Sequence, residues 1–231
     1  MEAKDRFHLI KNHKNDIEGV VVELRKDNKV TKIITDGFAI CDRCYNKGNY
    51  RYYTEFTIRE PLGKKGIFTT ILMNPSERTC PPCSIEPSIQ NAIKIAYLEG
   101  YEKVVALHII PYIDTNSDYA LNKCTDKKVK NMDMIKKHLA RTDVKDVMAA
   151  WGLKPYARRQ FHPIINALLD ELEGKNVYTF CRNLYKINYP KHTGRISIES
   201  CSDCKDGKLL IKYDDLSGLR AKPNHVKTHN Y

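Results

Sequence analysis

The chain has 231 residues, of which 42% are hydrophobic and 29% are charged. These proportions are close to the average of globular proteins and exclude a collagen-like repeat, a coiled-coil rod and a wholly disordered chain. The 39 Lys and Arg residues outnumber the 28 Asp and Glu residues, giving a net charge of +11. This excess favours a polyanionic partner such as DNA, although a lysine-rich composition alone also produces it.

No apolar stretch approaches the roughly 20 residues that a membrane helix needs, and the N-terminal residues lack the apolar core of a signal peptide. We therefore expect a cytoplasmic protein that does not associate with membranes, and we expect it to be a monomer. One segment, 175–195, carries five Lys or Arg residues and no Asp or Glu, interleaved with aromatic rings. Cations that contact phosphates beside rings that stack on bases are typical of nucleic-acid binding.

Strands and helices alternate along the chain. Residues 18–25 and 29–35 predict a hairpin, because β-branched residues flank an Asp-Asn turn. Later strands are predicted at 50–58, 66–73, 103–110, 144–151, 176–181 and 208–213, and helices at 85–99, 131–141 and 159–173. This order predicts an α/β fold, a three-layer sandwich with a mostly parallel central sheet and its ligands beyond the carboxyl ends of the strands.

We expect four parts. Residues 1–48 form N-terminal hairpins, 49–196 the α/β core, 197–216 a C-terminal hairpin and 217–231 a polar tail. The two terminal hairpins together predict a small lobe that resembles a zinc ribbon.

Six of the eight cysteines form three Cys-x-x-Cys pairs, and two of these pairs sit at predicted hairpin tips close to a glycine. A reducing compartment argues against a disulfide framework. Two such knuckles make a tetrahedral, structural Cys₄ zinc site, whose predicted ligands are Cys41, Cys44, Cys201 and Cys204. Coincidence, oxidative sensing and two incomplete sites are the alternatives.

The third pair, Cys80 and Cys83, brackets two prolines. It is a redox pair, a second metal site with Cys124 and Cys181, or a rigid loop with two spare thiols, and we favour the loop. The spacings of the cysteines do not match an iron–sulfur pattern well.

The segment Asn74-Pro75-Ser76 follows the strand predicted at 66–73. Proline fixes the backbone, the Asn amide both donates and accepts, and the Ser hydroxyl lies beside free backbone N–H groups. By itself this tripeptide is a turn. Its place at the carboxyl end of a buried strand makes it a candidate site as well.

Four motifs resemble those of the bacterial and phage family DUF1643 and occur in the same order: Asn74-Pro75-Ser76, Glu86-Pro87-Ser88-Ile89, Ala150-Trp151-Gly152 and Pro190-Lys191-His192. The resemblance covers about residues 50–196. The chain departs from the family pattern after Ser76, where Glu77-Arg78 and the Cys80 to Cys83 segment stand, and after His192, where Thr193 replaces a proline.

That family is in turn similar, in the placement of its motifs, to the uracil-DNA glycosylase superfamily. The resemblance implies an enzyme that flips a base out of DNA and hydrolyses its N-glycosidic bond. Asn74 would hold the water and His192 would donate to the departing base or brace the phosphate.

Further side chains are assigned to the site on the same resemblance or on their chemistry. Ser76 and Glu86 join Asn74 and His192 as candidate catalytic residues, although Glu86 also suits a helix N-terminus. The candidate substrate-binding residues are Tyr112, Asp114, Trp151, Arg158, Arg159, Tyr185, Lys191 and Arg195. For Trp151 a place in the core is the simpler interpretation, and for Asp114 a place in a loop.

Three functions follow from the sequence. The first is a DNA glycosylase for an unusual or modified base, acting in repair, defence or phage–host conflict. The second is a zinc-stabilised nucleic-acid-binding protein without catalysis. The third is a hydrolase of free nucleotides or nucleosides, for which the chain lacks a glycine-rich phosphate loop.

Overall fold

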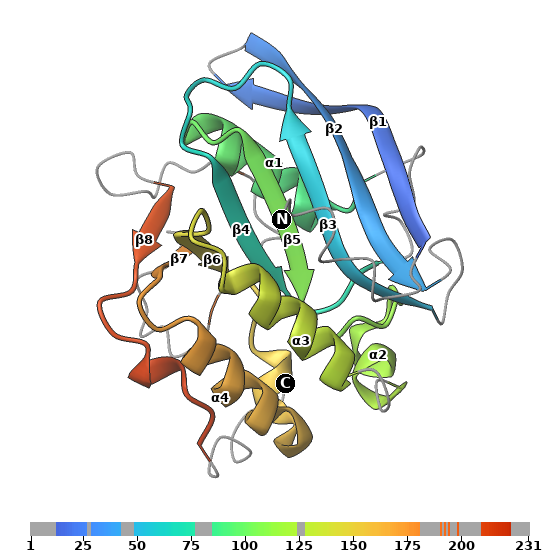
Figure 1. Ribbon diagram of the computed structural model, residues 1–231, viewed down its shortest axis with the longest axis vertical. Coiled ribbons are helices and arrows are strands. Elements are labelled where there is room, and N and C mark those ends of the chain that lie inside the picture. The colour runs from blue at the N-terminus through green and yellow to red at the C-terminus, as the bar shows by residue number, and fades with distance from the viewer. Residues whose placement is uncertain are drawn as a thin grey trace.

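The computed structural model describes residues 13–26, 29–42, 49–76, 85–123, 128–180 and 209–222, together with Pro190, His192, Gly194 and Ile198. Its strands are β1 (His13–Lys26), β2 (Lys29–Asp42), β3 (Tyr50–Ile58), β4 (Ile67–Leu72), β5 (Lys103–His108), β6 (Asp146–Ala149), β7 (Asn176–Phe180) and β8 (Leu210–Lys212). They form one eight-stranded sheet in the order β1-β2-β3-β5-β4-β6-β7-β8 (Figure 1).

The sheet is parallel only in its middle. Strand β4 pairs in parallel with β5 and with β6, and β6 pairs in parallel with β7. The pairs β1 with β2, β2 with β3, β3 with β5 and β7 with β8 are all antiparallel. The predicted three-layer sandwich with a mostly parallel sheet and a separate ribbon-like lobe is therefore wrong, because the N-terminal hairpin belongs to the main sheet.

The error has its physical origin in β3. Residues 54–57 of this strand pair with residues 103–106 of β5, which joins the N-terminal hairpin to the parallel strands. Most of β3 is buried on both faces, as in a central strand. Side-chain periodicity predicts that a segment is a strand, but the strand that satisfies its backbone N–H and C=O groups is chosen by the tertiary fold.

The helices are α1 (Pro87–Leu98), α2 (Ser117–Lys123), α3 (Lys128–Leu139) and α4 (His162–Glu171), with short 3₁₀ turns η2 (Lys154–Ala157), η3 (Arg159–Phe161) and η6 (Ser217–Leu219). Helix α1 starts with Pro87, whose missing N–H costs nothing at that position, and it is followed by Gly100, whose φ of 81° suits the end of a helix. None of the helices in the described part is long and apolar enough to span a membrane.

The sheet separates two apolar clusters. Helix α1 buries Ile89 and Ile93 against one face, together with Phe68 of β4. Helices α3 and α4 cover the other face, where Ile135 and Leu168 pack with the core (Figure 1). Alternate residues of β4 and β5 contribute to the two clusters, as strand geometry requires.

The chain order around β4 creates a topological switch. From β4 the chain passes through α1 to β5 on one side, and from β5 it crosses through α2 and α3 to β6 on the other side. The connections that follow β4 and β6 therefore leave the sheet in different directions. A crevice at the carboxyl ends of these strands is the expected consequence.

Residues 217–222 pack against the α4 side of the molecule. Leu219 is 1% exposed and joins the core cluster on this face. The backbone N–H of Ala221 donates to the side-chain oxygen of Asn166 at 2.9 Å, and the guanidinium of Arg220 contacts Asp170 at 2.6 Å. The start of the segment predicted as a tail is thus attached to the core.

His138 of α3 predicts a measurable pH dependence of stability. Its ring is buried, with Nε2 at 2.8 Å from the hydroxyl of Thr69, and burial together with the charge of Arg141 lowers its pKa to about 3 from 6.5. Between these values the unfolded chain binds a proton that the folded protein does not. Stability is therefore lost as the pH falls below 6.5, with a slope approaching about 1.4 kcal/mol per pH unit.

The variant His138→Gln removes this term. We expect the free energy of unfolding, measured by urea denaturation between pH 6 and pH 4, to fall less steeply than in the wild type by about 1.4 kcal/mol per pH unit. Carboxylates and other histidines contribute equally to both proteins. Parallel pH profiles for the two proteins would contradict the assignment.

Candidate functional site

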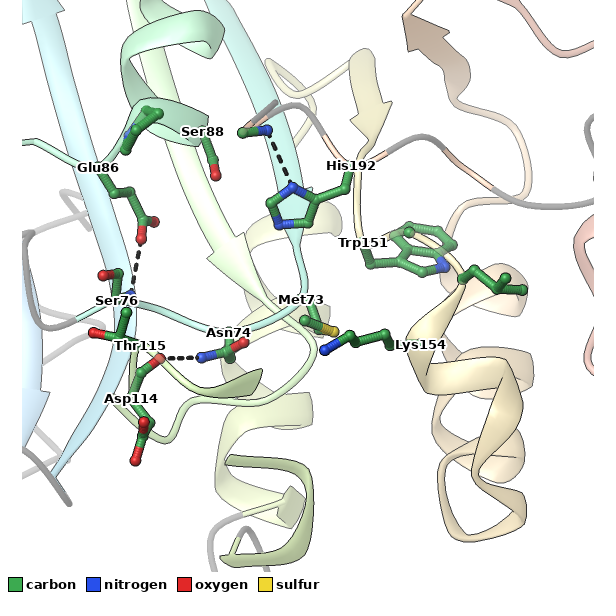
Figure 2. Close-up of a pocket in the computed structure, with 14 residues that line it drawn as sticks. Met73, Asn74, Ser76, Glu86, Ser88, Asp114, Thr115, Trp151, Lys154 and His192 are labelled. Carbon is green, nitrogen blue, oxygen red and sulfur yellow. Dashed lines mark hydrogen bonds between the residues drawn. The ribbon is translucent and has the colours of Figure 1, made fainter. Parts of the chain in front are cut away.

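A pocket of about 590 Å³ opens at the carboxyl ends of β4 and β6, beside the N-terminus of α1 (Figure 2). This is the position that the switch in chain order predicts, and its volume lies within the range of small-molecule sites. Its lining residues are Met73, Asn74, Ser76, Glu86, Pro87, Ser88, Asp114, Thr115, Trp151, Gly152, Leu153, Lys154, His192 and Gly194.

Asn74 is fixed in one orientation by main-chain acceptors. Its side-chain Nδ2 donates to the carbonyl oxygen of Asp114 at 2.8 Å and to that of Pro75 at 3.2 Å. Figure 2 shows the amide nitrogen directed at Asp114, on the lower side of the pocket. The backbone N–H of Asp114 in turn donates to the Pro75 carbonyl at 3.1 Å. The amide oxygen of Asn74 is therefore the end that can accept a hydrogen bond from a ligand or a water.

Glu86 joins three elements at the pocket wall. It lies at the N-cap position of α1 and is 5% exposed. Its Oε2 accepts the backbone N–H of Ser76 at 2.8 Å, and its Oε1 lies 3.5 Å from Nε2 of His108 at the end of β5. A negative charge at a helix N-terminus is favourable. The carboxylate thus connects the segment after β4 to α1 and β5.

His108 lies beneath the pocket and is fully buried. Desolvation lowers its pKa, the nearby Glu86 carboxylate opposes this effect, and the positive charge of the buried Arg51 adds to it. The net direction is downward, so the imidazole is neutral at physiological pH. His108 is thus a core histidine, and its contact with Glu86 links it to the site.

His192 enters the pocket from the opposite side to Asn74 (Figure 2). Its Nδ1 accepts the backbone N–H of Gly194 at 3.1 Å. A neutral imidazole with an accepting Nδ1 carries its proton on Nε2. His192 therefore presents an N–H donor at Nε2.

Two glycines allow His192 to approach the wall. Gly152 has a φ of 75°, and a Cβ there would lie 3.2 Å from Cβ of His192. A Cβ on Gly194 would lie 2.9 Å from Cε1 of His192 and 2.8 Å from the Ser88 hydroxyl. Larger residues at these positions would displace the imidazole.

Trp151 forms part of the pocket wall but is 0% exposed. Its indole N–H donates to the hydroxyl of Tyr156 at 3.4 Å, and this hydroxyl donates to the carbonyl of Leu219 at 2.8 Å. The indole is thus held in the core, as the simpler interpretation of its sequence position has it.

The charges around the pocket are mixed. Glu86 contributes a carboxylate and Asp114 its backbone carbonyl, whereas Lys154 and His192 contribute a cation and an imidazole. The Asp114 carboxylate points away from the pocket (Figure 2). Lys154 also forms an ion pair with Asp118 of α2, with Nζ and Oδ2 2.9 Å apart. The described wall is therefore not a basic crevice, and cations lie mainly outside it.

The structure brings six of the predicted site residues to this pocket, namely Asn74, Ser76, Glu86, Asp114, Trp151 and His192. Tyr112 is nearly buried between the rings of Tyr50 and Tyr119 and is not part of the lining, and Arg158 and Arg159 lie on the exposed connection after β6. Tyr185, Lys191 and Arg195 lie outside the described residues.

Sequence reasoning missed several lining residues. Lys154 and Thr115 gave no signal in the sequence, because an exposed lysine after a strand and a threonine in a loop are common. Ser88, Gly152 and Gly194 lie within or beside the recognised motifs. For the two glycines the signal was present, since Gly152 directly follows Trp151 and Gly194 lies two residues after His192.

Among the predicted zinc ligands, only Cys41 lies within the described residues. It is fully buried at the end of β2 and disulfide-bonded. In the described part of the chain no group of three or more His, Cys, Asp or Glu side chains is placed to hold a metal ion. The four-cysteine zinc site stays a prediction, and it requires Cys41 as a free thiolate.

A family model described as "Protein of unknown function (DUF1643)" matches residues 51–193, which is more than half of the chain. The chain belongs to the DUF1643 family. The comparisons of this chain with the curated proteins and with the solved structures found no match. The segment matched to DUF1643 contains every lining residue of the pocket except Gly194, whereas β1, β2 and β8 lie outside it.

The contacts of Glu86 predict a cost on its removal. In Glu86→Ala the partly buried Ser76 N–H loses the Glu86 acceptor, and we expect the free energy of unfolding to fall by about 1–3 kcal/mol in urea denaturation at pH 7. Glu86→Gln keeps a side-chain oxygen for this N–H and should lose less. Glu99→Ala, at the other end of α1, serves as the control, because its contact with Lys65 is a surface ion pair. A Glu86→Ala loss no larger than the control's would argue against the bridging role.

The zinc prediction is tested by metal analysis of protein prepared under reducing conditions. We expect about one zinc per chain, and we expect Cys41→Ser to lose it and to melt at a lower temperature. Cys124→Ser should keep the metal, because this cysteine is outside the predicted set. A stable wild-type protein without zinc would refute the site.

Proposed function

We propose that this DUF1643 protein hydrolyses the N-glycosidic bond of an unusual or modified base that is flipped out of DNA. The observation that carries the proposal is the convergence of Asn74 and His192, far apart in the sequence, on one pocket of about 590 Å³. The similarity of the motif placement to the uracil-DNA glycosylase superfamily supports the same reaction class. Fold and motif analogy alone would not suffice.

The orientations of the two side chains suit the roles proposed for them. Hydrolysis requires a water held against the anomeric carbon and a donor to the departing base. The Asn74 amide oxygen is the free end of a fixed amide and can accept a hydrogen bond from that water. Because Nδ1 of His192 accepts the backbone N–H of Gly194, the neutral ring carries its proton on Nε2, and we assign this N–H to the departing base.

The carboxylate of Glu86 favours the charge that develops in this reaction. The sugar becomes an oxocarbenium-like cation as the base leaves, and fixed negative groups stabilise such a charge. Glu86 is 5% exposed, so solvent screens its carboxylate little. The same carboxylate disfavours a phosphate inside the pocket.

The distribution of charge supports a nucleic-acid strand over a free nucleotide. The carboxylate of Glu86 lies at the pocket wall, whereas Arg158 and Arg159 are exposed on the adjoining connection. An extruded base and its sugar would occupy the pocket while the phosphates of the strand remain outside it, near cations. The net charge of +11 also favours binding to the negatively charged phosphates of a nucleic-acid strand.

The test is cleavage of oligonucleotides and phage DNA that carry varied bases, scored as alkali-labile abasic sites. We expect Asn74→Ala and His192→Ala each to lower the single-turnover rate by roughly 10²–10⁴-fold, the range for a positioned polar group or general acid. Asn176→Ala is the matched control, because Asn176 begins β7 at the opposite end of the parallel strands and should keep the wild-type rate.

Other outcomes identify the alternative functions. Salt-sensitive DNA binding without any abasic product would favour a non-catalytic nucleic-acid-binding protein. Release of free bases from nucleosides, without action on oligonucleotides, would favour a nucleoside hydrolase. Cleavage that is unchanged in Asn74→Ala would remove Asn74 from the mechanism.

A further inference from the structure

Tyr119 is the one exposed aromatic residue in the described part of the chain. It lies on α2 and its residue is 42% exposed, whereas every other described ring is buried or partly buried. A large ring that stays exposed to solvent does not gain the favourable free energy of burying its apolar surface. Such a residue beside a pocket is a candidate for ligand contact.

The ring of Tyr119 is supported from within the protein. Its centroid lies 6.2 Å from that of Tyr112, which in turn packs edge-on against Tyr50 at 5.5 Å. The ammonium of Lys123 lies 5.5 Å from the Tyr119 centroid. Aromatic contact from below and a cation at its side hold the ring in a defined place.

Helix α2 borders the mouth of the pocket. It begins two residues after Thr115, a lining residue, and Asp118 of α2 is paired with Lys154, another lining residue. Tyr119 directly follows Asp118 in the sequence. The exposed ring of Tyr119 and the ammonium of Lys123 thus belong to a helix that is tied to the pocket wall through Asp118 and Lys154.

We propose that Tyr119 and Lys123 form a strand-binding surface, on which Tyr119 stacks against a nucleobase adjacent to the one in the pocket and Lys123 contacts a phosphate. The inference rests on the proposed function, because it assigns the strand contact of the same site. Rings combined with cations suit single-stranded or locally unpaired nucleic acid, since every base has a face that stacks. The positive net charge of the chain complements such a strand.

The test measures binding of a fluorescein-labelled, single-stranded oligonucleotide of mixed sequence by fluorescence anisotropy. The Asn74→Ala background is used so that cleavage is slow compared with the binding measurement. Adding Tyr119→Ala should weaken binding roughly 5- to 100-fold, the range for loss of one base–aromatic stack. Tyr119→Phe should bind as the parent does. Lys123→Ala should weaken binding and reduce the slope of log affinity against log salt concentration by about one.

Tyr97→Ala is the matched control, because Tyr97 is a partly exposed tyrosine near the end of α1 that lies away from the pocket. It should bind like the parent, and all variants are compared at matched melting temperatures. Absence of oligonucleotide binding at low salt, or equal affinity of Tyr119→Ala and the parent, would overturn the inference. Binding that depends on Tyr119 without abasic product from any substrate would uphold this surface while refuting the glycosylase proposal.

Discussion

The position of β4 between β5 and β6 is the constraint on which the site depends. A strand whose successor lies on one side and whose second successor lies on the other forces the connections at its carboxyl end apart. The gap that this leaves is walled by the Asn74 turn, by the N-terminus of α1 and by the Trp151 segment. The antiparallel strands widen the sheet without changing this geometry. The pocket therefore lies at the carboxyl ends of parallel strands, although the expectation for the whole sheet was wrong.

The second constraint is electrostatic. A carboxylate that is 95% withdrawn from solvent is unfavourable unless donors compensate for its lost hydration. For Glu86 the Ser76 N–H, the start of α1 and the nearby His108 provide this compensation. Because these groups come from three elements, the charge also fixes how the elements meet. One buried group thus serves both the stability of the wall and the polarity of the pocket.

The sequence predicted the elements better than their assembly. Apolar periodicity located α1, α4 and the parallel strands, and the Asn-Pro-Ser motif located the turn at the end of β4. The pairing of β3 with β5 was not predictable, because a strand buried on both faces fits several neighbours equally. Helix α2 was missed since seven residues with few apolar positions give no periodic signal.

Within the site, the chemical types of the residues were predictable and their orientations were not. Asn74 and His192 were identified from motifs, but the free end of the amide and the protonated ring nitrogen follow from main-chain partners, Asp114 and Gly194, that no pattern reveals. The exposure of Tyr119 could not be predicted from the sequence for a similar reason. Its exposed position on α2, the helix that contacts the pocket residue Lys154 through Asp118, is a property of the tertiary structure.

Two successive hydrogen bonds, from Trp151 to Tyr156 and from Tyr156 to Leu219, connect the pocket wall to the segment around residue 219. Leu219 lies outside the part of the chain shared with DUF1643, yet its carbonyl is the last link behind the indole. Proteolysis that removed Leu219 would leave the Tyr156 hydroxyl without this acceptor and would weaken the support of the Trp151 indole. It would remove none of the residues that line the pocket.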